Sequence, residues 1–366
     1  MNIAFLSKRQ YMQKDVIDDR YARVYELPNQ LAHQGHRVLG VCLSYRKRAE
    51  GRFEHYREDE GLLEWRSFNL GALIAPGFWR YLRQTEALLR DFKPDLLLGC
   101  SDCLHAVITA HLARKIKVPY FLDLYDNYES FGLAKIPGLL PLYRQAVKNA
   151  TGVSCVSEPL SDYIHRHYSH GNVLTLESTI TGGDFQPRDK QACRKSLDLP
   201  EHGRLIGVAG SLSRSRGINL LYDSFLRLAE SDAGLHLALA GPIDRHCPIP
   251  NHPRIHYLGM LPHGRICDFY NALDLAVVCM RDTEFGRYAF PQKTYEILAC
   301  QTPILTARLG ALAQTFKDYP QCLYEADNPI DLQQKIAALL RAPCTVDIPI
   351  PTWSEQAERL AEWLRT

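Results

Sequence analysis

Short apolar runs alternate with helix-length segments along the whole chain, and this alternation restricts the possible folds more than any other feature. In the first half, the pattern predicts strands at residues 3–6, 37–43, 95–99, 120–124 and 152–156, and helices at 21–34, 79–91 and 104–115. In the second half, it predicts strands at 205–209, 235–240, 255–258, 275–278 and 303–306, and helices at 218–230, 264–272 and 292–299. Such alternation is typical of parallel sheets covered by helices. The sequence therefore predicts an α/β fold.

The length of 366 residues predicts two doubly wound, Rossmann-like domains rather than one. Glycine, proline and charge cluster at 182–199, so we expect domains of residues 1–186 and 187–348. The tail, 349–366, is expected to form a helix that returns to the first domain, because five apolar residues share one helical face: Trp353, Ala357, Leu360, Ala361 and Leu364. Ligands of such sheets bind beyond the carboxyl ends of the strands, so two facing domains predict a site in the cleft between them.

Composition argues against several classes of protein. Hydrophobic residues make up 46% and charged residues 23%, as in soluble globular proteins, and a net charge of +2 does not support a nucleic-acid partner. The chain shows no signal peptide and no apolar run of about 18 residues, and its 11 scattered cysteines favour reduced thiols. We expect a cytoplasmic protein, with peripheral contact at the inner face of the membrane. Residues 76–83 mix aromatic and basic side chains, which fits either a membrane-surface helix or a core-covering helix with exposed arginines.

Several familiar motifs are missing from the sequence. No G-x-G-x-x-G follows the first strand and no P-loop occurs, which disfavours dinucleotide dehydrogenases and P-loop NTPases. Cys100 and Cys103 form one C-x-x-C with His105 close by, but a single pair predicts neither a zinc site nor a redox motif. No Asp-x-Asp occurs anywhere in the chain.

A loop rich in glycine and arginine follows the first strand of the second half. The strand ends at Gly210, the loop carries Arg214 and Arg216, and Gly217 opens the next helix. Glycine lets a ligand approach the backbone closely, and arginine binds phosphate with a planar fork. The loop therefore predicts phosphate binding, with a solvated surface loop as the alternative.

The segment 290–305 carries the strongest functional signal. Pro291 suits the first turn of a helix, and the free N–H groups of a helix start favour a diphosphate. Lys293 adds a full positive charge, and Glu296 lies one turn further, where a carboxylate can accept hydrogen bonds from a ribose diol. We interpret the segment as part of a nucleotide pocket; for Glu296, a solvated helix position is the alternative.

Together these motifs resemble the retaining glycosyltransferases of the GT-B fold, family 4. The resemblance runs nearly end to end and rests on the order and spacing of its motifs: 31–38, 183–187, 210–217, 239–242, 255–262, 269–275 and 291–303. It implies that Arg216 contacts the donor diphosphate and that Glu296 is the second glutamate of a paired motif. Tyr288 stands where the first glutamate is expected, Glu284 is the nearest acid, and Ser211 stands where an arginine is common.

From the motifs and the resemblance together we select eleven candidate donor-binding residues. They are Gly210, Ser211, Arg214, Arg216, Glu284, Gly286, Tyr288, Pro291, Lys293, Thr294 and Glu296. The diphosphate is expected to be held by Arg216, Lys293 and the helix start, with no cofactor and no essential metal.

Two further clusters lie in the first half. Asp126 and Asn127 follow the fourth strand, where a carboxylate can stabilise a cationic anomeric carbon or orient an acceptor hydroxyl. The resemblance implies a His or Asp in this region, so we select Asp126 first and Asn127 second as catalytic; a helix N-cap is the alternative. The charged loop 8–23 suits an anionic acceptor such as a lipid-linked diphosphate sugar, and we select Arg20, Tyr21 and Arg23 for acceptor binding. A solvated loop with an N-cap at Asp18 or Asp19 remains the alternative.

The resemblance implies retaining sugar transfer from a nucleotide-diphosphate donor to a glycan or lipid-linked acceptor in bacterial envelope polysaccharide synthesis. One alternative is a non-catalytic subunit that supports a partner enzyme, which Tyr288 and Ser211 motivate. A sugar phosphorylase or synthase on the same fold is another.

Overall fold

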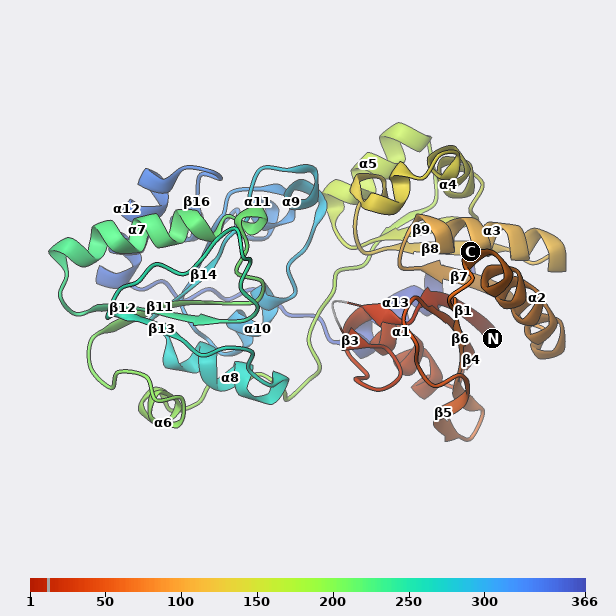
Figure 1. The fold of residues 1–366 in the computed structure, drawn as a ribbon, viewed down its shortest axis with the longest axis horizontal. Coiled ribbons are helices and arrows are strands. Elements are labelled where there is room, and N and C mark those ends of the chain that lie inside the picture. The colour runs from red at the N-terminus through yellow and green to blue at the C-terminus, as the bar shows by residue number, and fades with distance from the viewer. Residues whose placement is uncertain (12–13) are drawn as a thin grey trace. The chain divides into compact units, whose positions relative to one another are not determined.

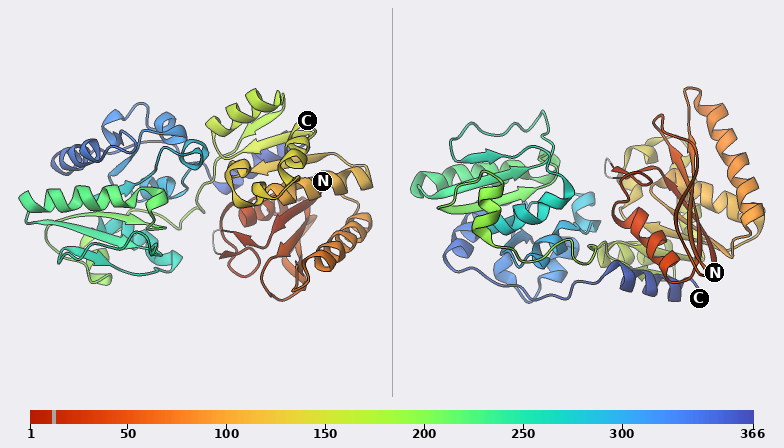
Figure 2. Two further views of the ribbon diagram at one scale, coloured as in Figure 1. Left: turned by 45° about the horizontal axis from the view of Figure 1, so that its top comes forward. Right: turned by 90° about the horizontal axis from the view of Figure 1, so that it is seen from below.

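The structure of the protein is a computed structural model that describes residues 1–11 and 14–366. The chain divides into two compact units (Figure 1). Unit 1 comprises Met1–Thr179 and Pro351–Thr366, and unit 2 comprises Ile180–Ile350. Each unit is a mainly parallel sheet with helices on both of its faces (Figures 1 and 2). The predicted α/β class is confirmed, and every strand and helix that the sequence predicts is present.

Unit 1 is built on an eight-stranded sheet in the order β10-β9-β8-β7-β1-β4-β6-β5. Its strands are β1 (Asn2–Lys8), β4 (Arg37–Ser44), β5 (Gly51–Glu58), β6 (Gly61–Asn69), β7 (Leu96–Cys100), β8 (Tyr120–Leu124), β9 (Gly152–Cys155) and β10 (Val173–Thr175). Its helices are α1 (Ala22–His33), α2 (Ile74–Phe92), α3 (Cys103–Ile116), η1 (Tyr128–Ser130), η2 (Gly132–Lys135), α4 (Leu139–Lys148), α5 (Glu158–Tyr168) and α13 (Trp353–Trp363). Two further short strands, β2 (Gln10–Tyr11) and β3 (Lys14–Asp15), form a separate antiparallel pair.

The two faces of this sheet bury alternate residues of each strand, as the pleat requires. In β1, Ile3 and Phe5 belong to the core that α1 and α13 cover, whereas Ala4 and Leu6 belong to the core that α2 and α3 cover. The five apolar residues selected in the tail all lie in the first of these cores. The C-terminal helix therefore packs in unit 1, as its amphipathic pattern predicts.

Unit 2 has a six-stranded, wholly parallel sheet in the order β13-β12-β11-β14-β15-β16. Its strands are β11 (Arg204–Ala209), β12 (Leu235–Ala240), β13 (Ile255–Tyr257), β14 (Leu275–Val278), β15 (Ile304–Ala307) and β16 (Leu323–Tyr324). Its helices are α6 (Lys190–Ser196), η3 (Arg214–Arg216), α7 (Ile218–Ser231), α8 (His263–Ala272), α9 (Glu284–Tyr288), α10 (Lys293–Ala299), α11 (Gly310–Thr315), η4 (Pro320–Cys322) and α12 (Pro329–Arg341).

The structure contains elements that the sequence did not predict, among them α4, α5 and α12, and it differs from the prediction at the domain boundary. The expected boundary after residue 186 falls inside unit 2, because Phe185 packs on His263 and Tyr270 of that unit. The hairpin of β5 and β6 was not predicted, since β5 is largely exposed and shows no apolar run. No helix in the described part of the chain combines the length and the apolar composition of a membrane span.

Candidate active site

The candidate donor site lies in unit 2, where β11 ends and α10 begins. The Lys293 ammonium donates a hydrogen bond of 2.6 Å to the carbonyl of Ala209, the last residue of β11. Gly210 follows with φ 118°, and a Cβ atom there would lie 2.5 Å from the Lys293 nitrogen. Glycine at this position therefore allows the backbone and the lysine to lie against each other. Gly241, after the neighbouring β12, approaches even more closely, since a Cβ atom there would lie 2.0 Å from the Gly210 carbonyl oxygen.

Glu296 is a buried acid one turn after Lys293 on α10. The Tyr270 hydroxyl donates a hydrogen bond of 3.4 Å to one of its carboxylate oxygens. Burial raises the pKa of Glu296 to about 7, although the charge of Lys293 and the Tyr270 hydrogen bond act in the opposite direction. A buried acid whose pKa is raised this far, with a charged partner such as Lys293 beside it, is typical of a functional site.

Arg216 supplies a second positive charge in the same region. Its guanidinium carbon lies 3.8 Å from the centre of the Phe285 ring, which fixes the side chain by a cation–π contact. Burial lowers the pKa of Lys293, and the charge of Arg216 lowers it further. The two cations and Glu296 therefore act on one another electrostatically, as the sequence motifs suggested.

The other candidate donor residues differ in their access to a ligand. Four of them are exposed or half-buried in the loops and helix starts nearby: Ser211, Arg214, Tyr288 and Pro291. Glu284 is exposed at the first position of α9, after the Thr283 cap. Two residues that were predicted to contact the donor directly are not accessible to it. Thr294 has no exposed surface, and Gly286 is buried where a Cβ atom would lie 2.1 Å from the Arg281 carbonyl oxygen, so both serve packing.

The proposed catalytic pair of unit 1 occupies the end of β8. Asn127 is buried and its side-chain oxygen accepts a hydrogen bond of 3.2 Å from the Glu129 backbone N–H, which makes it the N-cap of η1. The cap alternative thus describes Asn127. Asp126 is half-buried beside it and presents a carboxylate at the strand end.

The prediction that Arg23 binds the acceptor is wrong. Its side chain is fully buried in the core of unit 1, where it donates hydrogen bonds of 2.8 and 2.5 Å to the two carboxylate oxygens of Asp123. Because Arg23 pairs with Asp123, which is 100 residues away in the sequence, its side chain does not contribute to the charged loop. Arg20 is exposed and Tyr21 is half-buried at the N-cap position of α1.

The cap alternative for the loop 8–23 is also wrong, since neither Asp18 nor Asp19 caps α1. Asp18 pairs with the buried Arg9, and Asp19 accepts a hydrogen bond from the Asp15 backbone N–H. Residues 12 and 13 of this loop lie outside the described residues.

A pocket at the strand ends of unit 1 was missed by the sequence interpretation. It has a volume of about 460 Å³ and includes Lys8, Asp102 and Phe131 in its lining. Asp102 accepts a hydrogen bond of 2.8 Å from a ring nitrogen of His105, which is fully buried. Burial alone would raise the pKa of Asp102, but the charge of His105 and its hydrogen bonds lower it to about 2. The available signal was the polar Ser-Asp pair directly after β7, which the C-x-x-C spacing obscured.

Two family models match the chain. Residues 22–176 match the glycosyl transferase 4-like domain, and residues 203–342 match the glycosyl transferases group 1. The first match lies in unit 1 and the second in unit 2, with the candidate donor residues inside the second. No group of three or more metal-ligating side chains occurs among the residues described.

Two curated relatives show where the similarity extends. D-inositol 3-phosphate glycosyltransferase 2 of Catenulispora acidiphila is 27% identical over 190 residues, which cover 47% of this chain and 43% of the relative. The putative teichuronic acid biosynthesis glycosyltransferase TuaC of Bacillus subtilis is 23% identical over 282 residues, which cover 77% of this chain and 68% of the relative. The first match thus spans less than half of the relative's length.

Solved structures match the whole chain. Sucrose-phosphate synthase of Thermosynechococcus elongatus superposes with a TM-score of 0.75 at 17% identity, over 100% of this chain and 94% of the other. HepE of Anabaena in complex with UDP superposes with a TM-score of 0.68 at 14% identity, over 99% and 95% of the two chains. At such identities the likeness concerns the fold. With both family models and the fold in agreement, the chain belongs to the GT-B glycosyltransferases of family 4.

Proposed function

We propose that the protein transfers a sugar from a nucleoside-diphosphate donor to a glycan or lipid-linked acceptor, with retention of anomeric configuration. The observation that carries the proposal is the charged cluster in unit 2, where Lys293 lies against Gly210 and interacts electrostatically with Arg216 and Glu296. The cluster combines two cations, a glycine whose backbone carries no side chain, and a buried acid. A nucleoside diphosphate offers the complementary groups, two phosphates and a ribose diol.

The two cations suit the diphosphate of the donor. Lys293 and Arg216 place positive charge where the leaving group gains negative charge as its bond to the sugar breaks. Because Gly210 has no Cβ atom, the Lys293 ammonium can lie directly against the backbone at the end of β11. Because these side chains supply the positive charge, the proposal requires no metal ion.

Glu296 is proposed to accept hydrogen bonds from the two ribose hydroxyls. Two carboxylate oxygens can accept from two neighbouring hydroxyls at once, and burial strengthens such bonds. The Tyr270 hydroxyl holds the carboxylate in place through its 3.4 Å hydrogen bond. The base and the transferred sugar are left open by these contacts.

Unit 1 is proposed to bind the acceptor in the pocket at its strand ends. Asp102 and Lys8 offer hydrogen bonds to hydroxyl groups, and the exposed ring of Phe131 offers a face for a sugar ring. Asp126, at the end of β8, is proposed to orient the attacking hydroxyl. Retention follows the family type that the sequence motifs resemble.

A role in bacterial envelope polysaccharide synthesis is supported by two relatives. TuaC is named for teichuronic acid biosynthesis, and a lipopolysaccharide core mannosyltransferase, LpsB of Rhizobium meliloti, is 27% identical over 155 residues. These names describe the two relatives; an envelope glycan or lipid-linked sugar as the acceptor of this protein is our proposal.

The donor site is tested by calorimetric titration of the purified protein with UDP, GDP and ADP. Arg216→Ala and Lys293→Met each remove a charged contact worth about 1.5–3 kcal/mol, which corresponds to about ten- to hundredfold weaker binding. Arg341→Ala is the matched control, because this exposed arginine lies at the last position of α12 in the same unit. Binding of one nucleotide that only the first two variants weaken supports the proposal; equal affinity in all four proteins contradicts it.

A further inference from the structure

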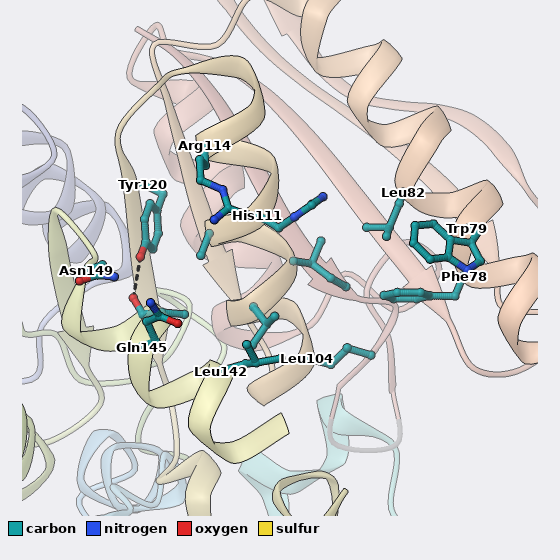
Figure 3. A pocket seen from close by; sticks show the side chains of 14 residues that line it. Phe78, Trp79, Leu82, Leu104, His111, Arg114, Tyr120, Leu142, Gln145 and Asn149 are labelled. Atoms are coloured by element: carbon teal, nitrogen blue, oxygen red, sulfur yellow. Dashed lines mark hydrogen bonds between the residues drawn. The ribbon is translucent and has the colours of Figure 1, made fainter. Parts of the chain in front are cut away.

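An apolar groove lies on unit 1 between helices α2, α3 and α4. Its volume is about 430 Å³, and Trp79, Leu82, Leu104 and Leu142 are among its lining residues (Figure 3). Figure 3 shows these side chains converging from the three helices, with Arg114 at the opposite end of α3 from Leu104. Neither the donor site nor the proposed acceptor pocket includes this groove.

Large apolar side chains stand exposed in and beside the groove. Leu73 and Ile74, at the start of α2, are 72% and 67% exposed, and Trp79 and Leu142 in the groove are 64% and 52% exposed. Side chains of this size gathered on one face of a protein mark a surface that another apolar phase covers. A Trp among them is typical of residues that lie at a membrane interface.

The same three helices carry a net positive charge. They hold seven basic and two acidic side chains, whereas the whole chain has a net charge of only +2. The acid Glu86 is already paired with two basic side chains. Among the described residues, the exposed Arg83, Arg114 and Lys148 have no ion pair with a carboxylate. We call these three side chains the basic rim: Arg114 lines the groove, and Arg83 and Lys148 lie on α2 and α4, the other two helices that line it.

We propose that this face of unit 1 docks on a lipid bilayer that contains anionic lipids. The apolar side chains enter the interfacial region, the groove takes lipid hydrocarbon, and the basic rim contacts the headgroups. A bilayer is the partner that offers hydrocarbon and a negative surface side by side. Membrane contact of this kind requires no membrane-spanning helix.

The position of the groove gives membrane docking a consequence for the acceptor. Two consecutive residues at the start of α3 line different cavities: Cys103 lines the proposed acceptor pocket and Leu104 lines the groove. An acceptor anchored in the bilayer would therefore reach the pocket over a short distance. The docking itself does not depend on the donor site in unit 2, so either can fail without the other.

The test is binding of the full-length protein to vesicles. Vesicles of phosphatidylcholine alone are compared with vesicles in which about a third of the lipid is phosphatidylglycerol. Trp79 is a built-in reporter, since Trp65 and Trp353 are buried and Trp363 is half-buried. We expect binding to the anionic vesicles, a blue shift of tryptophan emission, and loss of both at high salt.

Paired variants separate the two parts of the surface. Trp79→Gln with Leu142→Gln removes the apolar contact, and Arg83→Gln with Arg114→Gln removes rim charge; each pair is expected to weaken vesicle binding about tenfold or more. All four side chains are exposed, so folding should be retained. The matched control replaces two exposed apolar residues of unit 2, Met260→Gln with Ile330→Gln.

Loss of vesicle binding in the two unit 1 pairs, with binding retained by the unit 2 control, supports membrane docking. Equal binding by all variants, equal loss in the unit 2 control, or no binding to anionic vesicles overturns it. A dimer in sedimentation velocity that Trp79→Gln with Leu142→Gln dissociates would also overturn it, because the face would then be an interface between two copies of the chain.

Discussion

Glu296 gives a sharp test of the donor site, because its proposed role requires an ionised carboxylate. Burial raises its pKa from 4.5 to about 7, so protonation falls within an accessible pH range. An ionised carboxylate accepts hydrogen bonds from both ribose hydroxyls, whereas a protonated one loses an acceptor position. Binding that needs the ionised form is present above pH 7 and is lost as the pH falls through 7.

The size of the effect follows from the pKa. With a pKa of about 7, about nine-tenths of the Glu296 side chains are ionised at pH 8 and about one-tenth at pH 6. Nucleotide binding should therefore weaken about tenfold over this interval, or by about 1.4 kcal/mol. Tyr270→Phe removes a hydrogen bond that lowers the pKa of Glu296, so the midpoint of its profile should move to higher pH.

The assay is a calorimetric Kd for UDP, GDP or ADP at pH 6, 7 and 8, measured for the parent protein and for Glu296→Gln. The terminal phosphate of the nucleotide also titrates near pH 6, but it does so with both proteins, so the ratio of the two Kd values isolates Glu296. Glu230→Gln, at an exposed position of α7, is the control. Parallel pH profiles for the parent and Glu296→Gln would show that ionisation of Glu296 does not control nucleotide binding.

Three further predictions concern the scaffold. Asp123→Asn should lower the free energy of unfolding of unit 1 by about 3–5 kcal/mol, because it leaves Arg23 charged and buried; the double variant with Arg23→Met should recover much of this in urea denaturation. Gly241→Ala should weaken nucleotide binding and lower the Tm of unit 2, since the new Cβ atom would lie 2.0 Å from the Gly210 carbonyl oxygen. Asp102→Asn should lower the free energy of unfolding by about 2 kcal/mol at pH 7, because the pKa of this acid is depressed to about 2 in the folded protein. The loss of stability should shrink as the pH falls from 4 towards 2, and a loss that stays constant over this range would contradict the prediction.

The grouping of Lys293, Glu296 and Gly210 in unit 2 could be predicted from the sequence, because these residues lie in short segments. Lys293 and Glu296 are three positions apart on one helix, and Gly210 follows directly on an apolar strand. Their spacing in the sequence and the order of the predicted strands were sufficient to predict that these residues lie together at the ends of the strands. The two buried positions in the same segments, Gly286 and Thr294, were wrongly selected, because helix phase relative to the core is set by packing.

Unit 1 was harder to predict, since its important contacts join distant residues. Arg23 stands in a charged stretch of sequence, and only the fold brings it to Asp123 in the core. Asp102 and His105 are close in the sequence, but Asp102 becomes part of a pocket only because the fold brings Phe131 and Lys8 next to it from other elements. A charged pattern without tertiary contacts does not tell a buried ion pair from a solvated loop.

Donor use by the protein can be measured as release of nucleoside diphosphate from a panel of UDP-, GDP- and ADP-hexoses. We expect release by the parent protein from at least one donor, and at least about hundredfold slower release by Lys293→Met, with Arg341→Ala unchanged. No release from any donor, together with no nucleotide binding, would contradict the account and favour a non-catalytic subunit that keeps the glycosyltransferase fold.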